Sequence, residues 1–179
     1  IEFILKTSDV DWDAVVKVST AHYVFPALYC NLKRVDFLHY LPNELVSYME
    51  YISDINRERN KQIILQANEL NNVLLANNVT PIFLKGTGNL LAEIYEDIAE
   101  RMVGDIDFIF SKEDYPKAIK LLRNFDYSEV IKYDYHYPEG KHYRRLQKEH
   151  AIAAIEIHSE ILGIEKYRKE FNYSVVEKD

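Results

Sequence analysis

The sequence predicts an α+β fold, in which a helical segment is followed by a small mixed β-sheet with flanking helices. Before Pro81, apolar residues recur at steps of three and four, as on the buried face of a helix. After Pro81, short β-branched and aromatic runs alternate with helical patterns, which is typical of a sheet with helices packed on it. We therefore expect three parts: a helical segment over 1–80, a core sheet over 81–162 and a helical tail over 163–179.

The first part is expected to hold three main helices. Ser8 and Asp9 are candidate caps for a helix that carries Trp12. Pro26 suits the first turn of a second helix, because proline is tolerated where a helix begins. A third and longer helix follows Pro42.

The second part alternates strands and helices along the chain. Ser111, with Asp114 three residues later, resembles a capping box that opens a helix. The expected elements, in chain order, are a strand at 82–84, a turn at 85–88, a helix at about 89–97, a strand at 105–110, the helix after Ser111, strands at 127–137 and 142–147, and a strand at 151–158.

Composition excludes several classes of protein. The 179-residue chain is 47% hydrophobic and 28% charged, so it can bury a core. Its net charge of −7 argues against bulk attraction to nucleic acid, and no apolar run is long enough to span a membrane. A single cysteine, Cys30, excludes an internal disulfide and a Cys-based zinc site, so we expect a reducing, cytoplasmic setting.

Three acidic residues are placed by strand alternation. In the run DIDFIF, Asp105 and Asp107 share one face, opposite the apolar face of the strand. In the run AIAAIEIH, Glu156 is a charged residue within an apolar strand, which is costly unless it is paired or metal-bound. If the two strands are neighbours, the three carboxylates form a site for Mg²⁺ or Mn²⁺. His158 shares the face of Glu156 and is interpreted as a packed, hydrogen-bonded core residue.

The expected turn at 85–88 complements these acids. Its two glycines lie between a strand and a helix, where backbone N–H groups bind phosphate oxygens. Gly86 and Thr87 are the candidate phosphate contacts, and Lys85 either adds positive charge or points to solvent. Arg101 either reaches a phosphate or forms a surface ion pair.

Tyrosine and basic residues concentrate between Tyr127 and Lys148, although the chain as a whole is acidic. A nucleotide base or an acceptor could stack on these rings. The alternative is a pair of amphipathic strands with half-buried tyrosines.

The run PIFLKGTGNLLAEIYEDIAERMVGDIDFIF, followed by IEIH, resembles the uncharacterised nucleotidyltransferase family of the polymerase-β-like superfamily. The upstream Trp12, His22 and FPALY run is similar to the N-terminal helices of that family. In the wider superfamily a Gly-Ser turn stands closer to the paired aspartates, whereas here Thr87 replaces the serine and the spacing to Asp105 is longer.

The resemblance implies two Mg²⁺ ions held by Asp105, Asp107 and Glu156, and an NTP such as ATP whose phosphates contact Lys85, Gly86, Thr87 and Arg101. It implies transfer of a nucleoside monophosphate to a hydroxyl-bearing acceptor, with release of pyrophosphate. The acceptor, which is a small molecule, a protein or an RNA, does not follow from the resemblance.

Two alternatives remain open at the level of sequence. A glycosyltransferase could use the D-x-D pattern to hold a sugar nucleotide through Mn²⁺, although the long N-terminal helices and small sheet speak against it. A non-catalytic nucleotide-binding module would bind metal and NTP without turnover.

Overall fold

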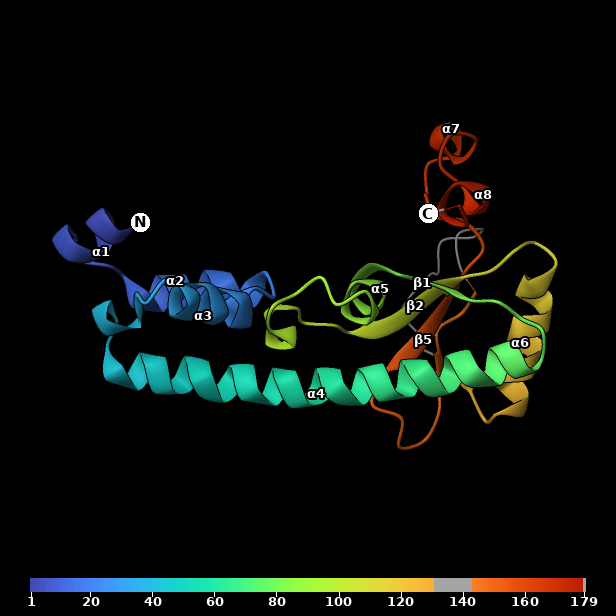
Figure 1. Ribbon diagram of the computed structural model, residues 1–179, viewed down its shortest axis with the longest axis horizontal. Helices are drawn as coiled ribbons and strands as arrows, with labels where there is room; N and C mark the ends of the chain where they lie inside the picture. The colour runs from blue at the N-terminus through green and yellow to red at the C-terminus, as the bar shows by residue number, and fades with distance from the viewer. Residues whose placement is uncertain (131–142, 179) are drawn as a thin grey trace. The chain divides into compact units, whose positions relative to one another are not determined.

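The computed structural model describes residues 1–130 and 143–178, and in these the predicted α+β class is confirmed. Tertiary contacts divide the chain into two compact units. The first comprises residues 1–61 and 93–102, and the second comprises residues 62–92 and 103–179. Figure 1 shows the elements along the chain, with the long helix α4 (Asn43–Ala76) contributing residues to both units. No helix in the described ranges is long and apolar enough to cross a membrane.

The first unit is helical. The expected helices after Asp9, at Pro26 and after Pro42 are confirmed, but the first is capped by Asp11, whose carboxylate accepts a hydrogen bond from the Ala14 backbone N–H. A short helix at the start of the chain was not predicted. The elements are α1 (Glu2–Thr7), α2 (Trp12–Ala21), α3 (Phe25–Arg34), η1 (Leu38–Tyr40), the first part of α4, and η2 (Ile98–Glu100).

The core of this unit forms where α3 and α4 meet η2. Its buried members are Phe25, Tyr29, Cys30, Leu32, Leu41, Met49 and Ala99. Burial raises the pKa of the Cys30 thiol to about 11, so this cysteine is a protonated core residue at neutral pH.

Side chains of α4 hold the segment that leads toward the sheet. The amide nitrogen of Asn60, on a fully buried side chain, donates hydrogen bonds to the backbone oxygens of Ile98 and Arg101 at 2.6 and 2.7 Å. Arg57 binds both carboxylate oxygens of Asp97, at 3.0 and 2.8 Å. That hydrogen bonding lowers the pKa of Asp97, so the pair is charged at neutral pH.

The second unit contains a five-stranded mixed sheet in the order β1-β2-β5-β4-β3. Strands β2 and β5 are parallel, and the other neighbouring pairs are antiparallel. The strands are β1 (Ile82–Leu84), β2 (Asp105–Ile109), β3 (Ser128–Glu129), β4 (Leu146–Gln147) and β5 (Ala154–His158).

The predicted strands at 82–84 and 105–110 are confirmed almost to the residue, whereas the strand expected at 151–158 begins only at Ala154. Of the strands expected at 127–137 and 142–147, the residues 131–142 lie outside the described part of the chain. The described residues of these two expected strands contain β3 and β4, which pair with each other.

One face of the sheet is apolar. The side chains of Ile106, Phe108, Ile155 and Ile157 are fully buried there. Helix α6 (Asp114–Asn124) buries Ala118 and Leu122, and the predicted Ser111 cap is present, since its hydroxyl accepts from the Asp114 N–H at 3.1 Å. The second part of α4 buries Ile63, Ala67, Leu70 and Leu74. The opposite face is therefore the one left for polar side chains.

The expected turn at 85–88 is wrong: this segment forms the first turn of helix α5 (Lys85–Leu91), which begins directly after β1. The helix ends before the expected residue 97, and η2 follows. Beyond β5, the expected helical tail contains two short helices, α7 (Glu165–Arg168) and α8 (Tyr173–Val176).

Gly88 allows α5 to approach β1 closely. A Cβ atom at this position would lie 2.7 Å from the backbone oxygen of Phe83, a contact that only a backbone shift can relieve. Gly88→Ala is expected to lower the free energy of unfolding by about 1–3 kcal/mol, measured by urea denaturation. Gly104→Ala is the matched control, because nothing lies within 4 Å of a Cβ built there. Equal stability of the two variants would contradict this packing argument.

Candidate active site

The polar face of the sheet carries the predicted acidic residues on its two parallel strands. In the register of β2 and β5, Asp105 pairs with Ala154, Asp107 with Glu156 and Ile109 with His158. Residues paired in this way point to the same face of the sheet. The predicted adjacency of Asp107 and Glu156 is therefore confirmed by the register.

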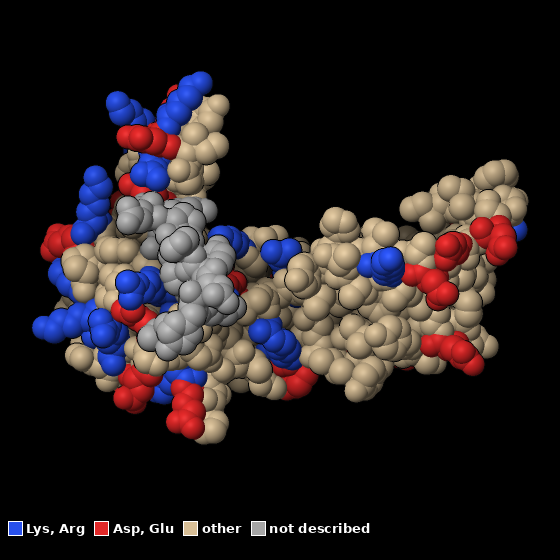
Figure 2. All heavy atoms as spheres, turned by 180° about the vertical axis from the view of Figure 1, so that it is seen from behind, with Lys and Arg blue, Asp and Glu red and all other residues tan. Residues whose placement is uncertain are grey.

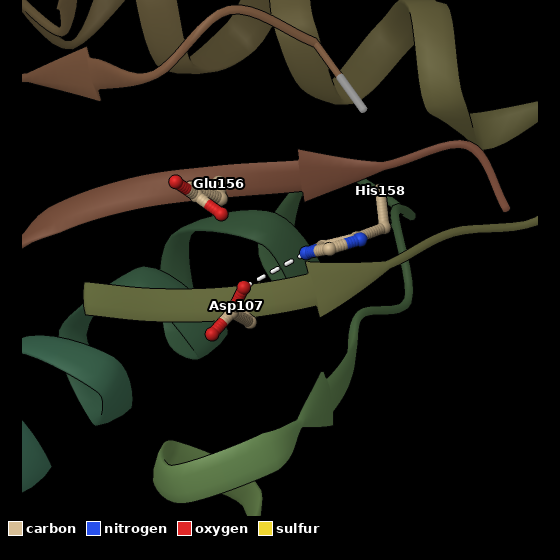
Figure 3. Close-up of side chains that lie close together, drawn as sticks. All are labelled: Asp107, Glu156 and His158. Carbon is tan, nitrogen blue, oxygen red and sulfur yellow. Dashed lines mark hydrogen bonds and ion pairs between the residues drawn. The ribbon is translucent and has the colours of Figure 1, made fainter. Parts of the chain in front are cut away.

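Three side chains converge on this face. Candidate ligand atoms of Asp107, Glu156 and His158 all lie within 4.8 Å of one another (Figure 3). The Nε2 atom of His158 lies 2.8 Å from Oδ1 of Asp107, and both side chains are almost fully buried. The interpretation of His158 as a packed, hydrogen-bonded residue is borne out, but its partner is a carboxylate of the candidate site.

Asp107 remains an anion despite its burial. Desolvation alone would raise its pKa, but hydrogen bonds from His158 and Lys85 outweigh it, so the net pKa is lowered from the ordinary value of 3.8. A buried carboxylate that stays ionised at neutral pH is suited to bind a cation.

Lys85 supplies a cation to the same carboxylates. Its Nζ lies 2.6 Å from Oδ1 of Asp107 and 3.9 Å from Oε2 of Glu156. Of the two orientations left open by the sequence, the side chain takes the one directed at the acidic cluster, while keeping about half of its surface exposed (49%).

Asp105 shares the face but lies outside this cluster. Its carboxylate is 3.7 Å from Nη2 of Arg145, a residue near the start of β4. The structure thus brings Asp107, Glu156 and His158 together, and pairs Asp105 with a basic residue that sequence reasoning assigned only to a general basic segment.

The other predicted phosphate contacts, Gly86, Thr87 and Arg101, do not lie in one environment. Gly86 and Thr87 are buried, and the Thr87 hydroxyl donates to the backbone oxygen of Asp105 at 3.1 Å, which links α5 to β2. Arg101 belongs to the first unit, where its side chain is exposed and its backbone oxygen accepts from Asn56 and Asn60.

In the basic and aromatic segment, Tyr127 is buried rather than half-buried, and its hydroxyl accepts a hydrogen bond from Gln66. Arg144 pairs with Glu129 at 2.8 Å. On the face of the molecule in Figure 2, the described Lys and Arg side chains are interspersed with Asp and Glu over the sheet-bearing unit. Tyr133, Tyr135 and Tyr137 lie outside the described residues.

The donor set fits a divalent metal. Two carboxylates on adjacent strands supply the hard oxygen ligands that suit Mg²⁺ or Mn²⁺. Because Nε2 of His158 already bonds to Asp107, the imidazole is positioned to orient this carboxylate, as outer partners of metal ligands commonly do.

The mixed sheet with its helices is an α+β fold of the kind expected for a nucleotidyltransferase-like domain, and it carries an acidic pair on two parallel strands. A family model described as "Uncharacterised nucleotidyltransferase" matches residues 8–176 of the 179-residue chain, and the chain belongs to this family. No curated protein and no solved structure matches the sequence.

Proposed function

We propose that this protein is a Mg²⁺-dependent nucleotidyltransferase that transfers a nucleoside monophosphate from an NTP to a hydroxyl-bearing acceptor. The observation that carries the proposal is the pairing of Asp107 with Glu156 on parallel strands, with their ligand atoms close enough to share one cation. Family membership supports the reaction class.

Each site residue has a role in this proposal. Asp107 and Glu156 would hold the divalent metal, with Asp105 as a further ligand if it releases Arg145. The bound metal supplies positive charge that neutralises the triphosphate. Glu156 would accept the proton of the attacking hydroxyl, and its partial exposure supports this role. The hydroxyl oxygen then bonds to the α-phosphorus, and the bond to the leaving pyrophosphate breaks.

Phosphate binding is assigned to the start of α5, which carries Lys85, Gly86 and Thr87. Lys85 is the strongest of these candidates because its exposed ammonium is already at the acidic cluster. Thr87 contributes by fixing Asp105 through the backbone hydrogen bond. Gly86, at the same helix start, remains a predicted phosphate contact, and Arg101 of the first unit remains a prediction from the sequence alone.

A double-label assay tests this proposal. The protein is incubated with Mg²⁺, a cell extract and one NTP at a time, labelled either at the α- or at the γ-phosphate. Nucleotidyl transfer puts the α-label on the acceptor and the γ-label in pyrophosphate. Phosphoryl transfer would put the γ-label on the acceptor. In a separate incubation with a sugar nucleotide labelled in the sugar, label on the acceptor would indicate the glycosyltransferase. Absence of α-labelled product with all four NTPs would contradict the proposal.

A further inference from the structure

The ammonium group of Lys85 lies where the positive charge of a metal ion bound by Asp107 and Glu156 would lie. Its Nζ lies within 4.0 Å of oxygens from both carboxylates, and the Asp107 side chain is only 4% exposed. Two carboxylates so close together repel each other when both are ionised, unless a cation lies between them. In this conformation the ammonium is that cation.

The backbone at Lys85 is held in an uncommon conformation. Its φ of 52° lies in the left-handed region, which is disfavoured for a residue with a Cβ atom. The next residue, Gly86, would adopt such a φ freely. Of Lys85 and Gly86, only Lys85 has a side chain that can reach the carboxylates, and it occupies the strained position. The ion pair with Asp107 offsets the strain.

We propose that Lys85 is a placeholder cation: it holds the two carboxylates together before metal binds, must leave them for metal to bind, and then contacts the phosphates of the nucleotide. This inference rests on the proposed function, since it assumes the same metal site. The exposed half of the side chain gives the ammonium room to move toward solvent, whereas Asp107 is fixed by His158.

Competition of this kind has a defined consequence for binding. Only the conformation with Lys85 displaced accepts metal. The apparent association constant for metal is therefore the intrinsic constant multiplied by the fraction of molecules in that conformation. Removing the ammonium is therefore expected to tighten metal binding and to weaken nucleotide binding. A lysine that served only to bind phosphate would affect the nucleotide alone.

The experiment measures Mn²⁺ binding by titration calorimetry and electron paramagnetic resonance, without nucleotide and at fixed ionic strength. Lys85→Met is expected to bind Mn²⁺ about tenfold more tightly than the unmodified protein. With Mn²⁺ saturating, the same variant is expected to bind a non-hydrolysable NTP analogue about tenfold more weakly. Lys85→Arg keeps the charge and is expected to stay close to the unmodified protein in Mn²⁺ binding.

Lys117→Met is the control for net charge. Lys117 is an equally exposed lysine (49%) of the same unit, paired with Glu113 and Asp114 away from the candidate site. Lys85→Gln is a second neutral variant, to be used if Lys85→Met fails to fold, and its expected behaviour is the same.

The outcomes separate the two proposals. Unchanged or weaker Mn²⁺ binding by the neutral Lys85 variants, or an equal gain in Lys117→Met, overturns the placeholder role while the metal site stands. Asp107→Asn is expected to abolish Mn²⁺ binding at this site. If the unmodified protein and the Lys85 variants bind no Mn²⁺, or bind it equally well with Asp107→Asn, the metal site itself is overturned. Tighter Mn²⁺ binding in the Lys85 variants together with weaker nucleotide binding supports both.

Discussion

Asp107→Asn is expected to lower the rate of Mg²⁺-dependent nucleotidyl transfer more than 100-fold while leaving the fold intact. The substitution preserves the shape of a side chain that is only 4% exposed, but it replaces an anionic ligand by a neutral amide. Loss of a residue that merely supports a metal ligand commonly costs about 10- to 100-fold, so loss of a ligand should exceed that range.

The measurement is the initial rate of transfer of an α-labelled nucleotide at saturating Mg²⁺. Asp126→Asn is the matched control, because the same change is made at an exposed position of the same unit. Thermal unfolding of both variants shows whether the loss of rate reflects the site or the fold. If Asp107→Asn retained a rate within twofold of the unmodified protein, the assignment of Asp107 would fail.

Asp105→Asn in the same assay tests the third predicted acid. The structure pairs Asp105 with Arg145 and leaves it out of the Asp107 cluster. A loss as large as that of Asp107→Asn would show that Asp105 leaves Arg145 to become a ligand. A loss of about 10- to 100-fold would fit a residue that only orients its neighbours.

Local patterns allowed the two acidic strands and their faces to be predicted. Alternation along DIDFIF and AIAAIEIH follows from the geometry of a single strand, and it correctly separated the polar from the apolar face. That Asp107 pairs with Glu156 is a question of register between distant segments. From the sequence, the three acids were predicted to form a site only if the two strands are neighbours. No local rule determines which strands become neighbours.

The features that sequence reasoning missed depend on tertiary contacts. Two glycines in four residues predicted a turn at 85–88, yet this segment is helical, and its Gly88 lies close to the Phe83 backbone. His158 was placed on the correct face, but its bond to Asp107 depends on the strand pairing. The approach of Lys85 to the acids depends on a left-handed backbone that residues with a Cβ rarely adopt.

A buried glutamine on α4 fixes the start of the strand that carries Glu156. The amide nitrogen of Gln66 donates to the backbone oxygen of Ala153 at 2.8 Å, and its amide oxygen accepts from the Ala153 N–H at 3.0 Å. The same nitrogen donates to the Tyr127 hydroxyl at 3.1 Å. Gln66 therefore bonds to the residue just before β5 much as a neighbouring strand would.

Gln66→Ala is expected to lower the free energy of unfolding by about 2–4 kcal/mol, because it leaves the buried N–H and C=O of Ala153 without these partners. Urea denaturation measures the change, with Gln62→Ala as the control at an exposed position one turn earlier on the same helix. Gln66→Glu can still accept from Ala153 but cannot donate to its oxygen, so it should also be destabilised. A loss below about 0.5 kcal/mol in Gln66→Ala would mean that β5, and the carboxylate of Glu156 with it, is positioned by the sheet alone.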